Sequence, residues 1–257
     1  MKYDALVRVH DGPMTTESTP GTASTSVRAL ARDHLTWAIL ASARAQLGTV
    51  GPAALSVRAV ARDVGLASSA VYRYFASRDD LLTALLVACF DEQGEEVEAA
   101  EAAARAVDPD DLSGRWSAVA QTFRRWALAH PWDYALLYGS PVPGYEAPVQ
   151  TVGPATRVTR VLMGLLADAA AAHVPLSRPG GTGPGPAFHA AMADLRAFAG
   201  ADLPDDVVLA GLAAWSGLVG GVTLEVFGHL DNAVGDREAW FAALTGRLDP
   251  FDTAAAR

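Results

Sequence analysis

Cysteine is almost absent from this chain of 257 residues, because Cys89 is the only one. A single cysteine excludes an internal disulfide and a zinc site built on cysteine ligands, and it fits a reducing cytoplasm. We also find no stretch of about 18 apolar residues free of charge that would suggest a membrane helix. Residues 1–26 contain acidic side chains and no apolar segment, so they do not form a secretory signal peptide. These absences favour a cytoplasmic protein with no membrane partner.

Alternating β-branched residues are scarce as well, whereas alanine and leucine are abundant. This composition favours helices, and we expect an all-α fold. The pattern predicts a mobile tail over residues 1–26, a three-helix unit over 27–77 and a larger helical domain over 78–257. We expect the first helix to run from about Val27 to Leu47, with Gly48 at its C-cap.

Charge is unevenly distributed along the chain. The formal net charge is -9 overall, but residues 1–90 carry a net charge of +2 and residues 91–257 a net charge of -11. A polyanion would therefore be attracted to one end of the molecule and repelled by the rest.

The stretch VGLASSAVYRYF, residues 64–75, predicts a helix-turn-helix unit. Ser56 is placed to cap a short helix that ends near Asp63, and Gly65 supplies the positive φ that the following turn requires. A second short helix starts at Ser68. Small apolar residues suited to a steep helix–helix crossing stand on the inner faces, namely Val57, Val60, Ala61, Val71 and Phe75.

The outer face of the second helix carries hydroxyl groups and an arginine. Hydroxyl groups donate to phosphate or base acceptors, and arginine pairs with guanine. A helix N-terminus also favours phosphate. We therefore include residues from the first turn of the preceding helix and from the start of the next among the expected DNA contacts. The expected DNA-contacting residues are Ser56, Arg58, Ser68, Ser69, Tyr72, Arg73, Tyr74 and Arg78.

The segment LSVRAVARDVGLASSAVYRYFASRDDLL, residues 55–82, resembles the DNA-binding segment of TetR-type (tetracycline repressor-like) transcriptional regulators. The serine, the glycine, the aromatic close and the following leucine pair agree in spacing. The family's capping serine is replaced by Ala67, so we expect either that Ser68 caps the recognition helix or that the helix frays. Two further segments, HPWDYALLYGSP and AWSGLVGGVTLEVFGHL, resemble the regulatory domain of one actinobacterial branch more weakly.

The resemblance implies a homodimeric, sequence-specific repressor without a cofactor. It would bind a palindromic double-stranded operator and be released by a small-molecule effector held in the helical regulatory domain. The low polar content of that domain suits a mostly apolar effector. We expect four aromatic residues to line the effector pocket: Trp126, Trp132, Tyr134 and Tyr138.

Glycine and alanine recur at helical spacing within residues 205–230. A glycine destabilises a soluble helix by about 1 kcal/mol relative to alanine, and close helix–helix approach would offset this. We expect a two-fold dimer interface through this helix and the next, AWFAALTGRL, although tight packing inside one subunit would explain the same pattern. The residues singled out are Ala210, Ala214, Gly217 and Gly221.

Two other functions stay open. One is a helical enzyme, or a metal or ligand carrier, that retains a vestigial DNA-binding module; the other is a constitutive DNA-binding protein without an effector. Glu225 and His229 stand four residues apart, a spacing that two metal ligands would share, but no third ligand is indicated. No nucleophile-elbow or phosphate-loop motif is present, so we expect neither an enzyme nor a metal site.

Overall fold

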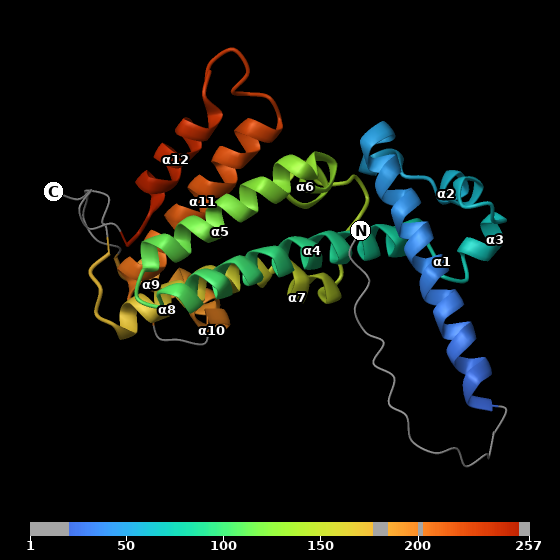
Figure 1. Ribbon diagram of the computed structural model, residues 1–257, viewed down its shortest axis with the longest axis horizontal. Coiled ribbons are helices and arrows are strands. Elements are labelled where there is room, and N and C mark those ends of the chain that lie inside the picture. Colours follow the sequence, from blue (N-terminus) through green and yellow to red (C-terminus); the bar gives the residue numbers. More distant parts are fainter. Residues whose placement is uncertain (1–20, 177–184, 200–202, 252–257) are drawn as a thin grey trace.

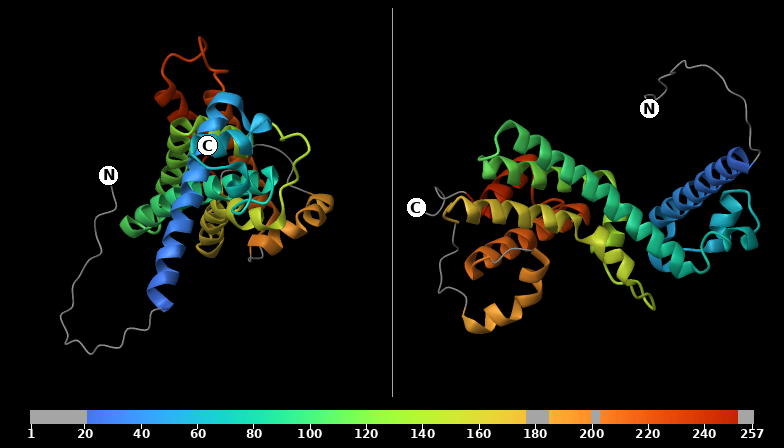
Figure 2. Two further views of the ribbon diagram at one scale, coloured as in Figure 1. Left: turned by 90° about the vertical axis from the view of Figure 1, so that its right-hand side faces the viewer. Right: turned by 90° about the horizontal axis from the view of Figure 1, so that it is seen from below.

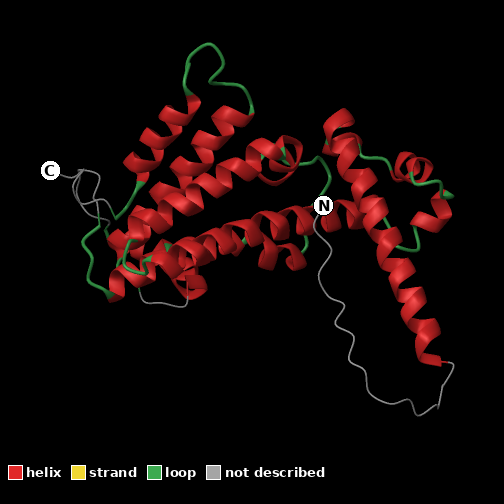
Figure 3. Ribbon diagram, viewed as in Figure 1, coloured by secondary structure: helices red, strands yellow, loops and turns green. Residues whose placement is uncertain are grey.

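The computed structural model describes residues 21–176, 185–199 and 203–251, and within these ranges it contains helices and no strand (Figure 3). The expectation of an all-α fold is therefore confirmed. Most of the expected tail, residues 1–20, lies outside the described residues. Two lobes are visible in Figure 1 and Figure 2, a small N-terminal lobe and a larger body, and they are joined by one long helix.

The N-terminal lobe consists of α1 (Gly21–Val50), α2 (Val57–Asp63) and α3 (Ser68–Val71), with a 3-10 turn η1 (Pro52–Ala54) after α1. The inner-face residues predicted from the sequence are all buried in its core. The N-terminal half of α1 extends beyond α2 and α3 (Figure 1).

The limits of α1 differ from the expectation. The helix begins at Gly21, so residues 21–26 are helical and not part of a tail. Gly48 lies inside the helix, which continues to Val50. The reason is tertiary: a β-carbon on Gly48 would lie 3.0 Å from Cδ1 of Trp132, so the glycine makes room for an indole ring of the body.

Helix α4 (Arg78–Val107) connects the two lobes. Ser77 caps it by accepting a hydrogen bond from the N–H of Asp80, at 3.0 Å. Its first turns contribute Leu81 and Leu85 to the core of the N-terminal lobe, and Cys89 and Val97 belong to the core of the body. One helix thus runs through both hydrophobic clusters.

The body is a layered helical bundle. Helix α4 packs most extensively against α5 and α8, while α11 packs against α12, α8 and α5. Its elements are α5 (Leu112–Ala129), α6 (Pro131–Tyr138), η2 (Val149–Thr151), α7 (Val152–Ala155), α8 (Arg157–Ala171), α9 (Pro186–Ala191), α10 (Ala193–Ala199), α11 (Asp205–Val226) and α12 (Arg237–Leu248).

Helix α11 is long and apolar enough to cross a membrane by length and composition, with a mean hydropathy of 1.9. The expectation that no segment of the chain meets this criterion is therefore wrong for residues 205–226. A core helix of a soluble protein meets the same criterion, and α11 is packed against three helices of the body. It also carries the buried Glu225, whose carboxylate pairs with Arg124 of α5.

Candidate DNA-binding surface and the interior of the body

The turn between α2 and α3 has the predicted geometry. The Ser56 hydroxyl accepts a hydrogen bond from the N–H of Ala59 at 3.4 Å and caps α2. Gly65 has φ +69°, the left-handed conformation that favours glycine. The next residue, Leu66, donates its N–H to the carbonyl of Ala61 at 2.8 Å and closes the corner.

The recognition helix is shorter than predicted and is capped differently. Ala67 occupies the N-cap without a side-chain hydrogen bond, so the expectation that Ser68 caps the helix is wrong. The helix ends at Val71, and a turn continues through Tyr74, whose N–H donates to the carbonyl of Val71 at 2.9 Å. The Ser68 hydroxyl is therefore not used in a cap.

Most of the expected contact residues of this segment differ in exposure from its core residues. Val71 and Phe75 are buried in the lobe, whereas Ser69, Tyr72 and Arg73 are exposed. The Tyr72 side chain is 47 % exposed although it is aromatic. The structure thus presents a hydroxyl, a phenol and a guanidinium together on one surface, with Ser68 half-buried beside them.

Tyr74 is half-buried and is covered by an arginine of α1. The guanidinium carbon of Arg32 lies 5.6 Å from the centre of the Tyr74 ring, a cation–π distance. Sequence reasoning missed Arg32, although it lies seven residues before the buried Ile39 and on the same helix face. That spacing places Arg32 beside the recognition segment.

Arg78 holds the loop that precedes α2. Its guanidinium donates to the carbonyls of Pro52 at 2.7 Å, Ala53 at 2.9 Å and Leu55 at 3.1 Å. These bonds satisfy most of its donors internally. A phosphate contact by Arg78 stays a prediction, and the bonds assign it a role in positioning η1.

The remaining arginines of the N-terminal lobe are differently placed. Four exposed arginines have no carboxylate partner within the described part of the chain: Arg32, Arg58, Arg62 and Arg73. Arg58 and Arg62 stand four residues apart on α2 and share its outer face. We call these four side chains, on α1, on α2 and in the turn after α3, the free-arginine surface.

Arg44 ties the lobe to the body. Its guanidinium contacts Glu92 of α4 at 2.6 Å and donates from Nε to Oδ2 of Asp133 on α6 at 2.7 Å. Burial opposes its charge, but the hydrogen bonds to Asp133 and Glu92 outweigh burial and raise the pKa of Arg44. Because the Asp133 side chain is itself buried, this ion pair joins the two lobes at a defined position.

The residues predicted to line a pocket do not line one together. Trp126 and Tyr134 are fully buried core residues, and Tyr134 and Tyr138 pack edge-on against Phe123. The Tyr138 hydroxyl donates to Oε1 of Gln93 at 2.7 Å. These rings fill the space between α4, α5, α6 and α11.

Trp132 lies outside this cluster. Its side chain is 57 % exposed and rests on Gly48 of α1, so the described structure does not place it in an interior pocket. The tryptophan belongs to the contact between the two lobes. Aromatic content alone did not separate a surface contact from an interior one.

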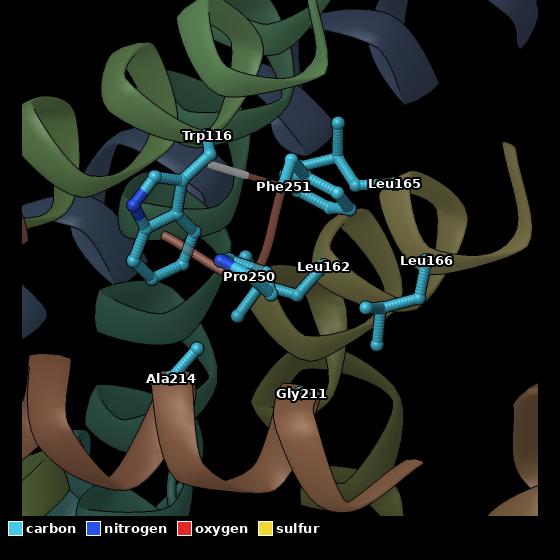
Figure 4. Close-up of a pocket in the computed structure, with 8 residues that line it drawn as sticks. All are labelled: Trp116, Leu162, Leu165, Leu166, Gly211, Ala214, Pro250 and Phe251. Atoms are coloured by element: carbon cyan, nitrogen blue, oxygen red, sulfur yellow. The ribbon is translucent and has the colours of Figure 1, made fainter. Parts of the chain in front are cut away.

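An apolar cavity occurs elsewhere, where α5, α8 and α11 meet (Figure 4). Its volume is about 10 Å³. The side chains around it come from Trp116 of α5, three leucines of α8, the small residues Gly211 and Ala214 of α11, and the segment Pro250–Phe251 that follows α12. A separate open groove of about 500 Å³ lies between α1, α4 and η2.

The four residues predicted to form a dimer interface pack inside the subunit. A β-carbon on Gly217 would collide with Leu248 of α12, and one on Gly221 would collide with Leu244. Ala210 and Ala214 are buried within the body. The small size of these residues serves the packing of α11 against its own neighbours, and their place in a dimer interface stays a prediction.

Glu225 and His229 do not form a metal site. Both carboxylate oxygens of Glu225 accept hydrogen bonds from Arg124 at 2.7 Å, and His229 is exposed. Within the ranges that the structure covers, no group of three or more His, Cys, Asp or Glu side chains is arranged to hold a metal ion. Glu225 is thus engaged by Arg124, while His229 lies in the turn after α11.

Comparison with known proteins agrees with this architecture. Residues 39–85 match the family described as "Bacterial regulatory proteins, tetR family", and residues 116–248 match "Tetracyclin repressor-like, C-terminal domain". The chain is similar to the HTH-type transcriptional regulator Rv1816 of Mycobacterium tuberculosis, with 39 % identity over 207 residues, covering 77 % of this chain and 83 % of the relative. The HTH-type transcriptional regulator Mb1846 of Mycobacterium bovis matches with the same identity and coverage.

Solved structures give the same result. The regulatory protein SCO4313 superposes with a TM-score of 0.64 and 31 % identity, covering 90 % of this chain and 98 % of that one. A protein from Rhodococcus sp. RHA1 superposes with a TM-score of 0.61 and 26 % identity, over 83 % of this chain and 93 % of that one. The free-arginine surface thus belongs to a helix-turn-helix domain, and the chain is a member of the TetR family, a non-enzymatic transcriptional regulator.

Proposed function

We propose that this protein is a cytoplasmic, homodimeric repressor that binds a palindromic operator and is released from it by a small apolar effector. The observation that carries the proposal is the free-arginine surface. It supplies unneutralised positive charge around the helix-turn-helix in a protein whose net charge is -9. When cationic side chains without internal partners contact DNA phosphates, the counterions that surround the DNA are released. This release provides most of the non-specific affinity.

Sequence readout is assigned to residues 68–74. With α3 and its following turn in a major groove, Ser69, Tyr72 and Arg73 would face base edges, and the Arg73 guanidinium would pair with guanine. Ser56 and Arg58 at the start of α2 would hold one phosphate strand. Arg62 adds to this set on the same face of α2.

The dimer is assigned to the exposed face of α11. The exposed positions follow a spacing of three and four residues, which forms one stripe along the helix. The stripe contains no charged side chain, and its large residues Leu209, Leu224 and Phe227 are 41 %, 43 % and 41 % exposed. The members of this α11 stripe are Leu209, Ala213, Ser216, Gly220, Leu224 and Phe227.

Helix α12 extends the same kind of surface. Its exposed residues include Ala239, Ala242, Ala243 and Gly246, which recur at helical spacing and allow close approach of another helix. A two-fold dimer buries the same patch on both subunits, and the uncharged α11 stripe meets this requirement without unpaired charges, whereas the exposed residues of α12 also include Glu238 and Arg247.

Operator selection from a random duplex pool tests DNA binding by the full-length protein. We expect palindromic sequences whose half-sites are separated by about 10 base pairs or a multiple. Tyr72→Ala should weaken binding to the selected sequence, whereas Trp37→Ala, which removes another exposed aromatic ring of the same lobe, should not. Equal affinity of both variants and the wild type would reject the assigned readout segment.

Mass measurement in solution tests the dimer. Leu224→Arg places a charge in the α11 stripe and should halve the particle mass and reduce operator affinity. Leu128→Arg makes the same change on α5, at a residue that is 41 % exposed, and should leave both unchanged. A dimer that persists in Leu224→Arg would place the interface on another face.

Reporter transcription in the presence and absence of the protein tests repression. We expect transcription downstream of the selected operator to fall when the protein is expressed. A rise in transcription would make the protein an activator. If no apolar compound changes the operator affinity, the protein is better described as a constitutive DNA-binding protein.

A further inference from the structure

The apolar cavity of the body is closed on one side by the segment that follows α12. Trp116, Leu162 and Ala214 stand on long helices, but Pro250 and Phe251 follow the end of α12 (Figure 4). Phe251 is only 8 % exposed, so its ring is inserted into the body. Its N–H donates to Oδ1 of Asp249 at 2.8 Å, a bond within the same short segment.

We propose that Phe251 is a removable plug, and that the cavity beneath it is a binding site for an uncharged apolar small molecule. The ligand would be an alkyl chain or a single aromatic ring without a charged group. The proposal deepens the effector response suggested above and rests on it only for the effect on DNA. As it stands, the cavity is about 10 Å³, the size of one water molecule at most, so a ligand must take the place of the ring.

The chemistry of the lining determines the class of ligand. Leu162, Leu165 and Leu166 present only hydrocarbon. The one polar side-chain group is the indole N–H of Trp116. It already donates to the carbonyl of Thr245 at 3.0 Å and needs no hydrogen bond from a ligand. A charged group buried here would have neither a counter-ion nor a hydrogen bond from these side chains.

The small residues of α11 maintain the space. A β-carbon on Gly211 would collide with Leu166, so the glycine lets α8 and α11 approach while Ala214 leaves room beside them. An apolar cavity of this kind stays dry, and larger examples of about 150 Å³ lined by similar residues bind benzene. Displacement of the Phe251 ring would enlarge this cavity in the direction of solvent.

The position of the cavity connects it to the DNA-binding lobe. Its walls α5 and α8 are the helices that pack most extensively on α4, and α4 continues into the core of the N-terminal lobe. A ligand that separates α5 from α8 would therefore act on the helix that carries the helix-turn-helix. A ligand bound in the cavity would alter operator affinity through this effect on α4.

Quenching of Trp116 fluorescence by 1-bromooctane tests the site in the full-length protein without DNA. We expect saturable quenching in the wild type, and at least tenfold tighter binding in Phe251→Ala. Leu128→Ala removes another apolar side chain, at an exposed position near the end of α5, and should bind like the wild type. Trp116→Phe should lose the saturable quenching, because the reporter is gone.

Tighter binding confined to Phe251→Ala, together with the loss of signal in Trp116→Phe, would support the plug. Wild-type affinity in a Phe251→Ala protein that retains its helicity and cooperative melting would overturn it. If Phe251→Ala does not fold, Phe251→Leu shortens the plug and should give an intermediate gain, and no gain there would overturn the proposal as well.

The charge of the probe tests the ligand class. We expect 1-octanol to compete with 1-bromooctane and octanoate not to compete, and equal competition by octanoate would reject an uncharged ligand. A separate gel shift with the selected operator distinguishes the site from the proposed function. Failure of the quenching titration rejects the site while leaving DNA binding intact, and failure of the gel shift rejects DNA binding while leaving the site intact.

Discussion

The arginines of the two lobes differ in what surrounds them. On the N-terminal lobe, Arg58 and Arg73 are exposed and have no carboxylate partner in the described ranges. In the body, Arg115 is 2 % exposed and contacts Glu101 at 2.5 Å and Asp168 at 2.7 Å. The comparison teaches that placement decides function: an arginine that internal carboxylates already neutralise has no charge left to offer to DNA.

The same division holds elsewhere in the body. Arg157 of α8 reaches across α4 to Glu98 at 2.6 Å, and its hydrogen bond lowers the pKa of that carboxyl below the ordinary range. Gly94 allows this crossing, because a β-carbon there would lie 2.7 Å from Cβ of Arg157. Acidic residues of the body are thus partly neutralised by its own arginines, and the positive charge of the N-terminal lobe stays available.

Removing a paired arginine should have the largest effect, and it should fall on stability. Arg124 is buried between Glu225, at 2.7 Å, and α12, so Arg124→Ala leaves a buried carboxylate without a partner. We expect a loss of about 3–5 kcal/mol in the free energy of unfolding, measured by urea denaturation. Arg125→Ala, at the exposed neighbouring arginine, should change it by less than about 0.5 kcal/mol. Equal losses in the two variants would contradict the assigned difference.

Removing a free arginine should affect DNA binding and not stability. We expect Arg73→Ala to lower affinity for the selected operator by about 1–3 kcal/mol, the value of a good arginine–base contact. The measurement is fluorescence anisotropy at fixed salt, with urea denaturation as the control. If Arg73→Ala lowers the free energy of unfolding but binds the operator with wild-type affinity, Arg73 stabilises the fold and does not contact DNA.

The pH dependence of stability tests how firmly the body buries the hydroxyl of Tyr134. Burial raises the pKa of Tyr134 to about 12, and its hydrogen bond with Thr223 acts in the opposite direction. Stability from this group is fully present below the ordinary pKa near 10 and is lost as the pH rises toward 12, because only the unfolded state ionises in that window.

At pH 11 this linkage removes about 1.4 kcal/mol from the wild type but not from Tyr134→Phe. We therefore expect the stability difference between the two proteins to shrink by that amount between pH 8 and pH 11 in urea denaturation. A difference that stays constant with pH would mean that the Tyr134 hydroxyl ionises as freely as it does in the unfolded chain.

The smallest effect is expected at Arg32. A phosphate contact by this side chain would add about one to the slope of log affinity against log salt concentration, so Arg32→Ala should reduce the slope by about one. Arg32→Lys keeps the charge but weakens stacking on Tyr74, and it should retain the slope. An unchanged slope in Arg32→Ala would limit the DNA-binding surface to α2 and residues 68–74.

Local sequence signals predicted the helix-turn-helix well. The cap at Ser56, the positive φ at Gly65 and the buried face around Val60 each depend on residues a few positions apart, and all are confirmed. The cap of α3 was predicted wrongly, because a helix of four residues starts at Ala67 without a side-chain hydrogen bond. The overall all-α class followed from composition and periodicity in the same way.

Long-range packing was not accessible from the sequence. The glycines of α11 indicate a close neighbour, but spacing does not tell whether that neighbour is another subunit or α12 of the same one. Trp132 and Trp126 look alike in the sequence, yet one lies at the contact with α1 and the other in the core. The partners Arg124 and Glu225 are separated by 101 positions, which no local pattern connects.

Helix α4 has 30 residues and contributes to the cores of both lobes. At the usual rise per residue its length is about 45 Å, so a tilt of about 5° at one end moves the other by roughly 4 Å. In a two-fold dimer the displacements of the two subunits add to roughly 8 Å, against a separation of roughly 34–36 Å between adjacent major grooves. If the protein dimerises on an operator as proposed, a change of a few degrees inside the body is therefore enough to take its two recognition segments out of register with duplex DNA.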